Sequence, residues 1–295
     1  MNTVFVPTDF TQSSYGGIAL GAAIAEKTKS PLTIHHNVKT LLNWEAMNQN
    51  ERLEHPRVLG ATVEAEQQLG QLVNDTFSDK LIVNRLVTHG ITPDEIVKNA
   101  QRLNSSVIIM GSHGVEESGR NFIESTVQKV IRSAGSPVIL AKQNVKARVP
   151  ERIVFPCLFN EDVHKPFCEI KKVAASLDAV IHLLFINTPA RFKDSRSIRS
   201  EMEKFAAECP DQKFVMDVYN HQDVVTGILE HAGDIDAGLI ALITRDRLHR
   251  PQYLLGITET LAFHSNLPIL SVNAKINKQE PDRELQNEPV VSQDI

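Results

Sequence analysis

Residues 107–126 read Val-Ile-Ile-Met-Gly-Ser-His-Gly-Val-Glu-Glu-Ser-Gly-Arg-Asn-Phe-Ile-Glu-Ser-Thr, and Ser136-Pro-Val-Ile-Leu140 follows after a helical segment. The apolar run at the start predicts a buried strand, and Gly111 and Gly114 come directly after it. Glycines at the end of a parallel strand let the backbone approach a ligand. Ser125 and Thr126 open the next helix with hydroxyls and free N–H groups, which suit a phosphate. Two glycines three residues apart are common, so the weight of this strand–loop–helix–strand unit depends on the chain around it.

The rest of the first half alternates apolar strands with helices. Strands are predicted at 4–7, 31–38 and 81–87, and helices at about 13–29, 57–77 and 92–103. Thr92-Pro-Asp-Glu95 marks the start of one helix, with Thr92 as its N-cap. A polar loop with the single tryptophan, Trp44, is predicted before the long helix. Strands that alternate with helices predict an α/β fold with a parallel sheet and right-handed crossovers.

The same pattern starts again near Pro150. Arg152-Ile-Val-Phe-Pro-Cys-Leu-Phe159 echoes Thr3-Val-Phe-Val-Pro-Thr-Asp-Phe10. The chain of 295 residues is therefore predicted to be an internal duplication of a unit of roughly 140 residues, a normal domain size. We assign residues 1–143 to a first domain and 151–274 to a second, and we expect the polar segment 276–295 to be mostly disordered.

Composition narrows the class of protein. The hydrophobic fraction of 42% is enough for large cores, and the net charge of −5 without a Lys/Arg block argues against nucleic acid or an anionic membrane as the main partner. No apolar run is long enough to span a bilayer, and the N-terminus lacks the basic region of a signal peptide. Cys157, Cys168 and Cys209 form no CxxC pair, which favours reduced thiols and a cytoplasmic protein.

A ligand in a doubly wound sheet binds beyond the carboxyl ends of the strands, where the winding reverses. If the first and fourth strands are neighbours, Asp9 and Gly111 face one cleft. A carboxylate there can accept from an exocyclic amine or a ribose hydroxyl, and the loop from Gly111 to Ser125 can wrap a phosphate chain. Two alternatives stay open: Asp9 could cap the first helix, and Gly111 and Gly114 could serve only as a turn.

These features together resemble the universal stress protein (UspA-like) family. The residues that carry the resemblance are the opening Val-Pro-Thr-Asp9, the Met-Gly-Ser-His-Gly114 turn and the helix before Pro-Val-Ile-Leu140, and the resemblance covers both halves as a tandem member. It implies two domains of the adenine nucleotide alpha hydrolase-like fold, each a five-stranded parallel sheet in the order 3-2-1-4-5. It also implies pairing of domains through the fifth strands, within one chain or between chains.

The resemblance further implies an adenine nucleotide site. The nucleotide-binding members carry G-x2-G-x9-G-[ST], an Asp after the first strand and a backbone contact at the end of the second. Candidate binding residues in the first half are Asp9, Asn37, Val38, Gly111, His113, Gly114, Ser125 and Thr126. ATP or another adenine nucleotide is the candidate cofactor, and Mg²⁺ is considered with it.

Glu124 departs from the family pattern because it replaces the third glycine. A carboxylate at this position would repel phosphate by up to several kcal/mol if poorly solvated, and by about 1 kcal/mol if it swings into water. Glu116 and Glu117 add negative charge to the loop, and Arg120 could compensate. ATP, AMP, another adenine compound and no ligand therefore all stay open.

The second half departs further from the pattern. Leu158 stands at the counterpart of Asp9, Ile243 at that of Gly111 and Asp246 at that of Gly114, so no family-type nucleotide site is expected there. Its basic loop could bind another anion, or it could be solvated or part of the contact between the halves. The basic residues of that loop are Arg245, Arg247, His249 and Arg250.

Neither a metal site nor a catalytic site follows from local patterns. His35 and His36 alternate across a strand, no His/Cys/Asp set has metal-ligand spacing, and no nucleophile–base pair lies within one motif. We therefore predict no metal ligands and no catalytic residues. The family role is a cytoplasmic stress-response regulator that binds adenine nucleotides. The alternative is an interaction or dimerisation module with both sites degenerate, and a slow ATPase is the weaker third hypothesis.

Overall fold

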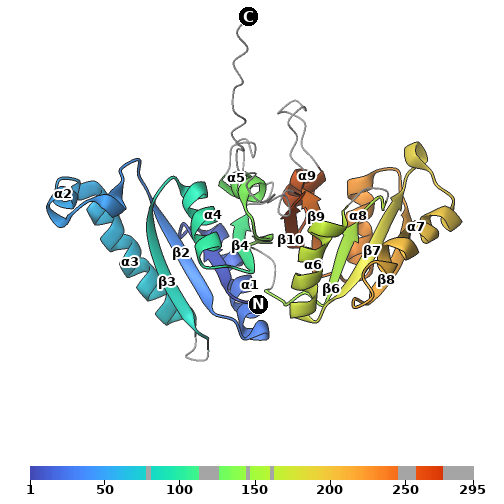
Figure 1. The fold of residues 1–295 in the computed structure, drawn as a ribbon, viewed down its shortest axis with the longest axis horizontal. Coiled ribbons are helices and arrows are strands. Elements are labelled where there is room, and N and C mark those ends of the chain that lie inside the picture. The colour runs from blue at the N-terminus through green and yellow to red at the C-terminus, as the bar shows by residue number, and fades with distance from the viewer. Residues whose placement is uncertain (78–80, 113–125, 144–146, 160–162, 245–256, 275–295) are drawn as a thin grey trace, which may run out of the picture.

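The computed structural model describes residues 1–77, 81–112, 126–143, 147–159, 163–244 and 257–274. Ten strands in these residues form one sheet in the order β3-β2-β1-β4-β5-β10-β9-β6-β7-β8 (Figure 1). The strands are β1 (Val4–Pro7), β2 (Leu32–Lys39), β3 (Val83–Gly90), β4 (Val107–Ser112), β5 (Val138–Lys142), β6 (Arg152–Pro156), β7 (Val180–Asn187), β8 (Phe214–Asn220), β9 (Leu239–Thr244) and β10 (Ile269–Asn273). The first five have the predicted order 3-2-1-4-5, and the second five repeat it.

Helices cover both faces of the sheet, as expected for a doubly wound α/β fold. On one face, α1 (Gln12–Thr28), α3 (Pro56–Thr76), α6 (His164–Leu177) and α7 (Ser195–Ala207) bury one apolar core. On the other, α4 (Thr92–Arg102), α5 (Thr126–Ser133), α8 (Val224–Asp234) and α9 (Ile257–His264) bury a second. Among the helices of the described residues, none is both long and apolar enough to cross a membrane.

The two halves are joined where β5 pairs antiparallel with β10, with Ile139 opposite Leu270. The joint carries two reciprocal side-chain bonds. Lys142 Nζ donates to Ala262 O of α9, and Asn273 Nδ2 donates to Arg132 O at α5, both at 2.5 Å. Burial lowers the pKa of Lys142. The two helices flank this joint near the middle of the molecule (Figure 1), so the fifth strands pair within the chain.

Two local predictions are wrong. Ile91 is the N-cap of α4 and Thr92 is already helical, because Thr92 Oγ1 instead accepts a hydrogen bond from Asn37 Nδ2 at 3.1 Å. The predicted polar loop contains the 3-10 helix η1 (Trp44–Ala46) and α2 (Gln49–Leu53). A reciprocal capping box between Asn48 and Glu51 stabilises the start of α2.

Candidate functional site

The turn after β1 is fixed by side chains. Phe10 has a left-handed φ of 61°, and its N–H donates to Thr8 Oγ1 at 3.0 Å. The Phe10 ring stacks on His36, with 4.5 Å between ring centroids. The His36 Nδ1–H donates to Thr8 O at 2.9 Å, which sets its tautomer. A left-handed conformation costs a non-glycine residue free energy, and these contacts hold it in place.

Asp9 is exposed at the carboxyl end of β1. Its Oδ1 accepts from Thr11 N at 3.1 Å and from Thr11 Oγ1 at 2.5 Å, while Ser13 Oγ lies 3.0 Å from Thr11 Oγ1. Within the described residues, Asp9 Oδ2 accepts no hydrogen bond. Thr11 is the N-cap of α1, so Asp9 does not cap the helix itself; it orients the residue that does.

Gly111 near the end of β4 lies against the first turn of α1. A Cβ added to it would stand 2.1 Å from Ser13 O and 2.6 Å from Ser14 Cα, and a Cβ on Gly17 would stand 2.6 Å from Gly111 N. Close approach of the helix therefore excludes every side chain at position 111. The glycine that the sequence suggests for a ligand or a turn already has a packing role. The structure places it one strand away from Asp9, since β1 pairs with β4.

The remaining candidate nucleotide-binding residues differ in burial and in the hydrogen bonds that they already make. Asn37 uses its side-chain amide on Gly90 O and Thr92 Oγ1, both at 3.1 Å, and Val38 is buried. Thr126 opens α5 and is half-buried. The other candidates and the residues of the predicted electrostatic conflict lie outside the described residues. These are His113, Gly114, Ser125, Glu116, Glu117, Arg120 and Glu124.

A buried polar chain lies beside these residues, and its connections cannot be read from the sequence. His35 Nε2–H donates to Thr88 Oγ1 at 2.7 Å, and Thr88 donates to Asn37 Oδ1 at 3.1 Å. His35 Nδ1 is buried without a partner in the described residues. Burial, with a smaller contribution from the charge of His36, lowers the pKa of His35 from 6.5 to about 3. The imidazole is therefore neutral at physiological pH.

The second half keeps the turn but not its acid. Phe159 has a φ of 55°, and its backbone nitrogen lies 3.3 Å from Cys157 Sγ. This contact corresponds to that between the Phe10 nitrogen and Thr8 Oγ1 in the first half. Cys157 N donates to Leu184 O as Thr8 N does to His35 O, which aligns the two turns. Leu158 then occupies the place of Asp9. The registers of β4 with β1 and of β9 with β6 align Ile243 with Gly111, as the sequence predicts. The basic loop residues 245–250 lie outside the described residues.

A separate hollow of about 370 Å³ lies near the amino ends of β1, β4 and β5, against α6. Its lining includes Asn104, Ser106, Glu169 and Lys172. The last two form an ion pair with each other at 2.8 Å. This hollow is at the opposite edge of the sheet from Asp9 and is therefore not the candidate site.

The first half thus has a five-stranded sheet in the order 3-2-1-4-5, with an aspartate after its first strand and a glycine near the end of its fourth. Residues 1–142 match the Universal stress protein family, so the first half of the chain is a domain of this family.

Three known proteins are similar to this chain in sequence or in fold. Universal stress protein MJ0577 of Methanocaldococcus jannaschii is 27% identical over 154 residues, which cover 48% of this chain and 94% of that protein. A universal stress protein from Archaeoglobus fulgidus shares the fold over 92% of this chain and 98% of its own, with a TM-score of 0.69 and 16% identity. A functionally unknown protein from Pseudomonas aeruginosa, PA1789, covers 92% of each chain at a TM-score of 0.53 and 16% identity.

Proposed function

We propose that the chain is a cytoplasmic regulator that binds an adenine nucleotide at the carboxyl ends of β1, β2 and β4. In this proposal residues 1–143 and 151–274 are separate domains, and the first domain holds the nucleotide site. Asp9 accepts a hydrogen bond from the nucleotide, and the loop from Gly111 to Thr126 binds its phosphates. The second domain contributes no site of this kind, because Leu158 and Ile243 replace the acid and the glycine.

One observation carries the proposal: Asp9 is an exposed carboxylate held at the point where the winding of the sheet reverses. The turn around it is rigid, since Thr8, Phe10 and His36 are bonded or stacked together. One carboxylate oxygen is oriented by Thr11, while the other accepts nothing within the described residues. A preorganised acceptor at a switch point is the arrangement by which doubly wound folds bind ligands.

Two observations favour the alternative, an interaction module without nucleotide. Gly111 is explained by the packing of α1, so this glycine does not require a ligand. Glu124 stands in the loop where the family pattern has glycine. In this alternative the antiparallel joint of β5 and β10 is the main feature of the chain, and both ligand sites are degenerate. A slow ATPase would in addition need a base, and the described residues suggest none.

Calorimetric titration of the full chain with ATP, ADP and AMP, with and without Mg²⁺, tests the site. We expect binding of one nucleotide per chain and a loss of roughly 10- to 100-fold in affinity for Asp9→Leu, because a charge-assisted hydrogen bond is lost. Leucine is the residue that the second half carries here, so the variant should fold. Asp75→Asn on the exposed side of α3 is the matched control and should bind as the parent does. Absence of binding at millimolar nucleotide would select the interaction module.

The loop is tested by two substitutions with opposite expected signs. Gly114→Asp copies the second half and should abolish binding, since it places a carboxylate at the phosphates. Glu124→Gly restores the family pattern and should tighten binding about fivefold, which corresponds to about 1 kcal/mol for a solvated like charge. If both variants keep the parent's affinity, the nucleotide binds elsewhere on the molecule.

A further inference from the structure

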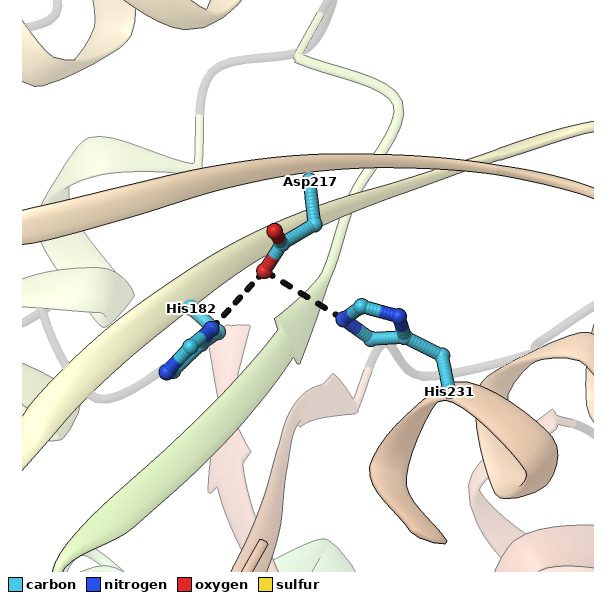
Figure 2. Close-up of side chains that lie close together, drawn as sticks. All are labelled: His182, Asp217 and His231. Atoms are coloured by element: carbon cyan, nitrogen blue, oxygen red, sulfur yellow. Dashed lines mark hydrogen bonds and ion pairs between the residues drawn. The ribbon is translucent and has the colours of Figure 1, made fainter. Parts of the chain in front are cut away.

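Two histidine side chains from separate elements of the second half converge on one carboxylate oxygen of a third element (Figure 2). His182 Nδ1 of β7 lies 2.8 Å from Asp217 Oδ2 of β8, and His231 Nε2 of α8 lies 3.3 Å from the same oxygen. The three ligand-type atoms lie within 4.8 Å of one another. The side chains of both histidines are 10% exposed and that of Asp217 is 23% exposed. We call these residues the His–Asp–His cluster.

The fold does not require titratable side chains at these positions. The registers of β2 with β1 and β3, and of β7 with β6 and β8, align His182 with Thr33 and Asp217 with Leu86. The helices α4 and α8 have equal length, and they align His231 with Asn99. The three equivalent positions of the first half therefore carry no imidazole and no carboxylate. Burying a charged group costs free energy, so the carboxylate and imidazoles of the second half call for a compensating interaction.

The cluster is not satisfied by its own hydrogen bonds. His182 Nδ1 forms a hydrogen bond with Asp217, but His231 Nε2 is buried and has no hydrogen-bond partner in the described residues. The nitrogen points toward the carboxylate (Figure 2) without the alignment that a hydrogen bond needs. A buried polar atom of this kind calls for a water molecule or an ion as its partner.

We propose that the His–Asp–His cluster binds a divalent transition-metal ion, with Zn²⁺ as the best match. Two imidazole nitrogens and one carboxylate oxygen form a three-ligand zinc set, and a water molecule takes the fourth position. Imidazole also suits Co²⁺ and Ni²⁺, whereas Mg²⁺ and Ca²⁺ prefer sites made of oxygen alone. The ion binds the unprotonated nitrogen of each imidazole, and each neutral ring keeps its proton on the other nitrogen. The bond to the ion also gives His231 Nε2 the partner that it lacks.

The surroundings fit a cation. Tyr219 packs against His231 with 5.5 Å between ring centroids, and its hydroxyl donates to Glu230 Oε2 at 3.1 Å. Glu230, the residue before His231 on α8, is thus connected to the cluster through the Tyr219 ring. The bound ion connects β7, the edge strand β8 and α8, and it lies away from the carboxyl ends of the strands. It is therefore a structural site, independent of the nucleotide site proposed in the first half.

The competing explanation is a carboxylate that pairs with a protonated histidine without any metal. Zn²⁺ titration of chelator-treated, tag-free full chain separates the two. We expect saturation at one ion per chain. Co²⁺, as a spectroscopic probe, should give the visible absorption of a tetrahedral site and no thiolate charge-transfer band, because the cluster contains no cysteine. Absence of saturable binding, or a thiolate band in the parent protein, overturns the proposal.

Variants taken from the first half test the assignment. His182→Thr and His231→Asn, measured separately, should each weaken Zn²⁺ binding more than about 100-fold, beyond the 10- to 100-fold that loss of an outer partner costs. The matched control is His164→Asn, which removes a histidine paired with one carboxylate, Glu208, at 3.2 Å. The His164→Asn variant should bind Zn²⁺ with the affinity of the parent protein. Unchanged affinity in both cluster variants overturns the proposal.

A gain of signal completes the test. His231→Cys puts a thiolate ligand at the same place, so Zn²⁺ binding should persist and the Co²⁺ complex should acquire a thiolate charge-transfer band. The same band should be absent when cysteine replaces His164. If His231→Cys binds Co²⁺ without the band, or if His164→Cys also produces it, the ion is bound by other residues and the proposal fails.

Discussion

Gly111→Ala is expected to destabilise the first half of the molecule by at least about 3 kcal/mol. The added methyl group would stand 2.1 Å from Ser13 O and 2.6 Å from Ser14 Cα, and backbone atoms cannot move aside as the end of a flexible side chain can. Relief requires that α1 shift away from β4, which loosens the core beneath Ile18 and Leu20. Because this shift weakens packing in the core, unfolding should have its midpoint at a lower urea concentration.

The measurement can be made selective for this half. Trp44 is the single tryptophan and is buried, so its fluorescence reports unfolding of the first half while circular dichroism reports both. Two glycines with open space around them serve as controls. Gly135→Ala should be nearly neutral, and Gly60→Ala within α3 should stabilise by about 0.5–1 kcal/mol. If Gly111→Ala unfolds at the same urea concentration as Gly135→Ala, α1 does not pack as described.

His35→Leu is expected to remove much of the acid sensitivity of the first half. The pKa of His35 falls from 6.5 to about 3 on folding, so between these values the unfolded chain binds more protons than the folded one. Stability therefore falls as pH falls below 6.5, by about 1.4 kcal/mol per unit. From pH 7 to pH 5 the loss is about 2 kcal/mol, and a leucine at position 35 cannot contribute to it.

Leucine is a matched choice because Leu184 occupies the equivalent position of β7. The comparison uses the slope of unfolding free energy against pH between 7 and 5, detected by Trp44 fluorescence, so any constant loss from the missing Thr88 contact cancels. His55→Asn, which replaces a half-buried histidine, is the control and should keep the parent's slope. Parallel slopes for His35→Leu and the parent would mean that His35 protonates equally in both states.

Much of the fold follows from the sequence because its signals are local. Apolar runs such as that of β4 predict the strands, and the repeated Phe155-Pro156 and Val6-Pro7 strand ends indicate the duplication. The strand order, in contrast, was implied only by the family resemblance. Even the alignment of Ile243 with Gly111 follows from counting. Prediction fails where a contact distant in the chain competes with a local preference. Thr92 has the chemistry of an N-cap, but Asn37, from another strand, donates to its hydroxyl.

The candidate site is predictable only in part. The position of Asp9 after β1 follows from the sequence, but its orientation by Thr11 and the Phe10–His36 stack depend on a left-handed turn that no local pattern announces. The hydrogen bonds from His35 through Thr88 to Asn37 join residues that are far apart in sequence. The lowered pKa of His35 can therefore be predicted only from the tertiary structure.

The sequence alone determined that residues 107–126 belong to a strand–loop–helix unit, that the unit occurs twice, and that only the first copy keeps Asp9, Gly111 and Gly114 together. Tertiary structure decided why Gly111 is glycine, since the distance between α1 and β4 is set by packing across the sheet. It also decided that His182, Asp217 and His231 meet. Their sequence separations match no metal motif, because strand register and helix crossover, rather than spacing along the chain, bring them together.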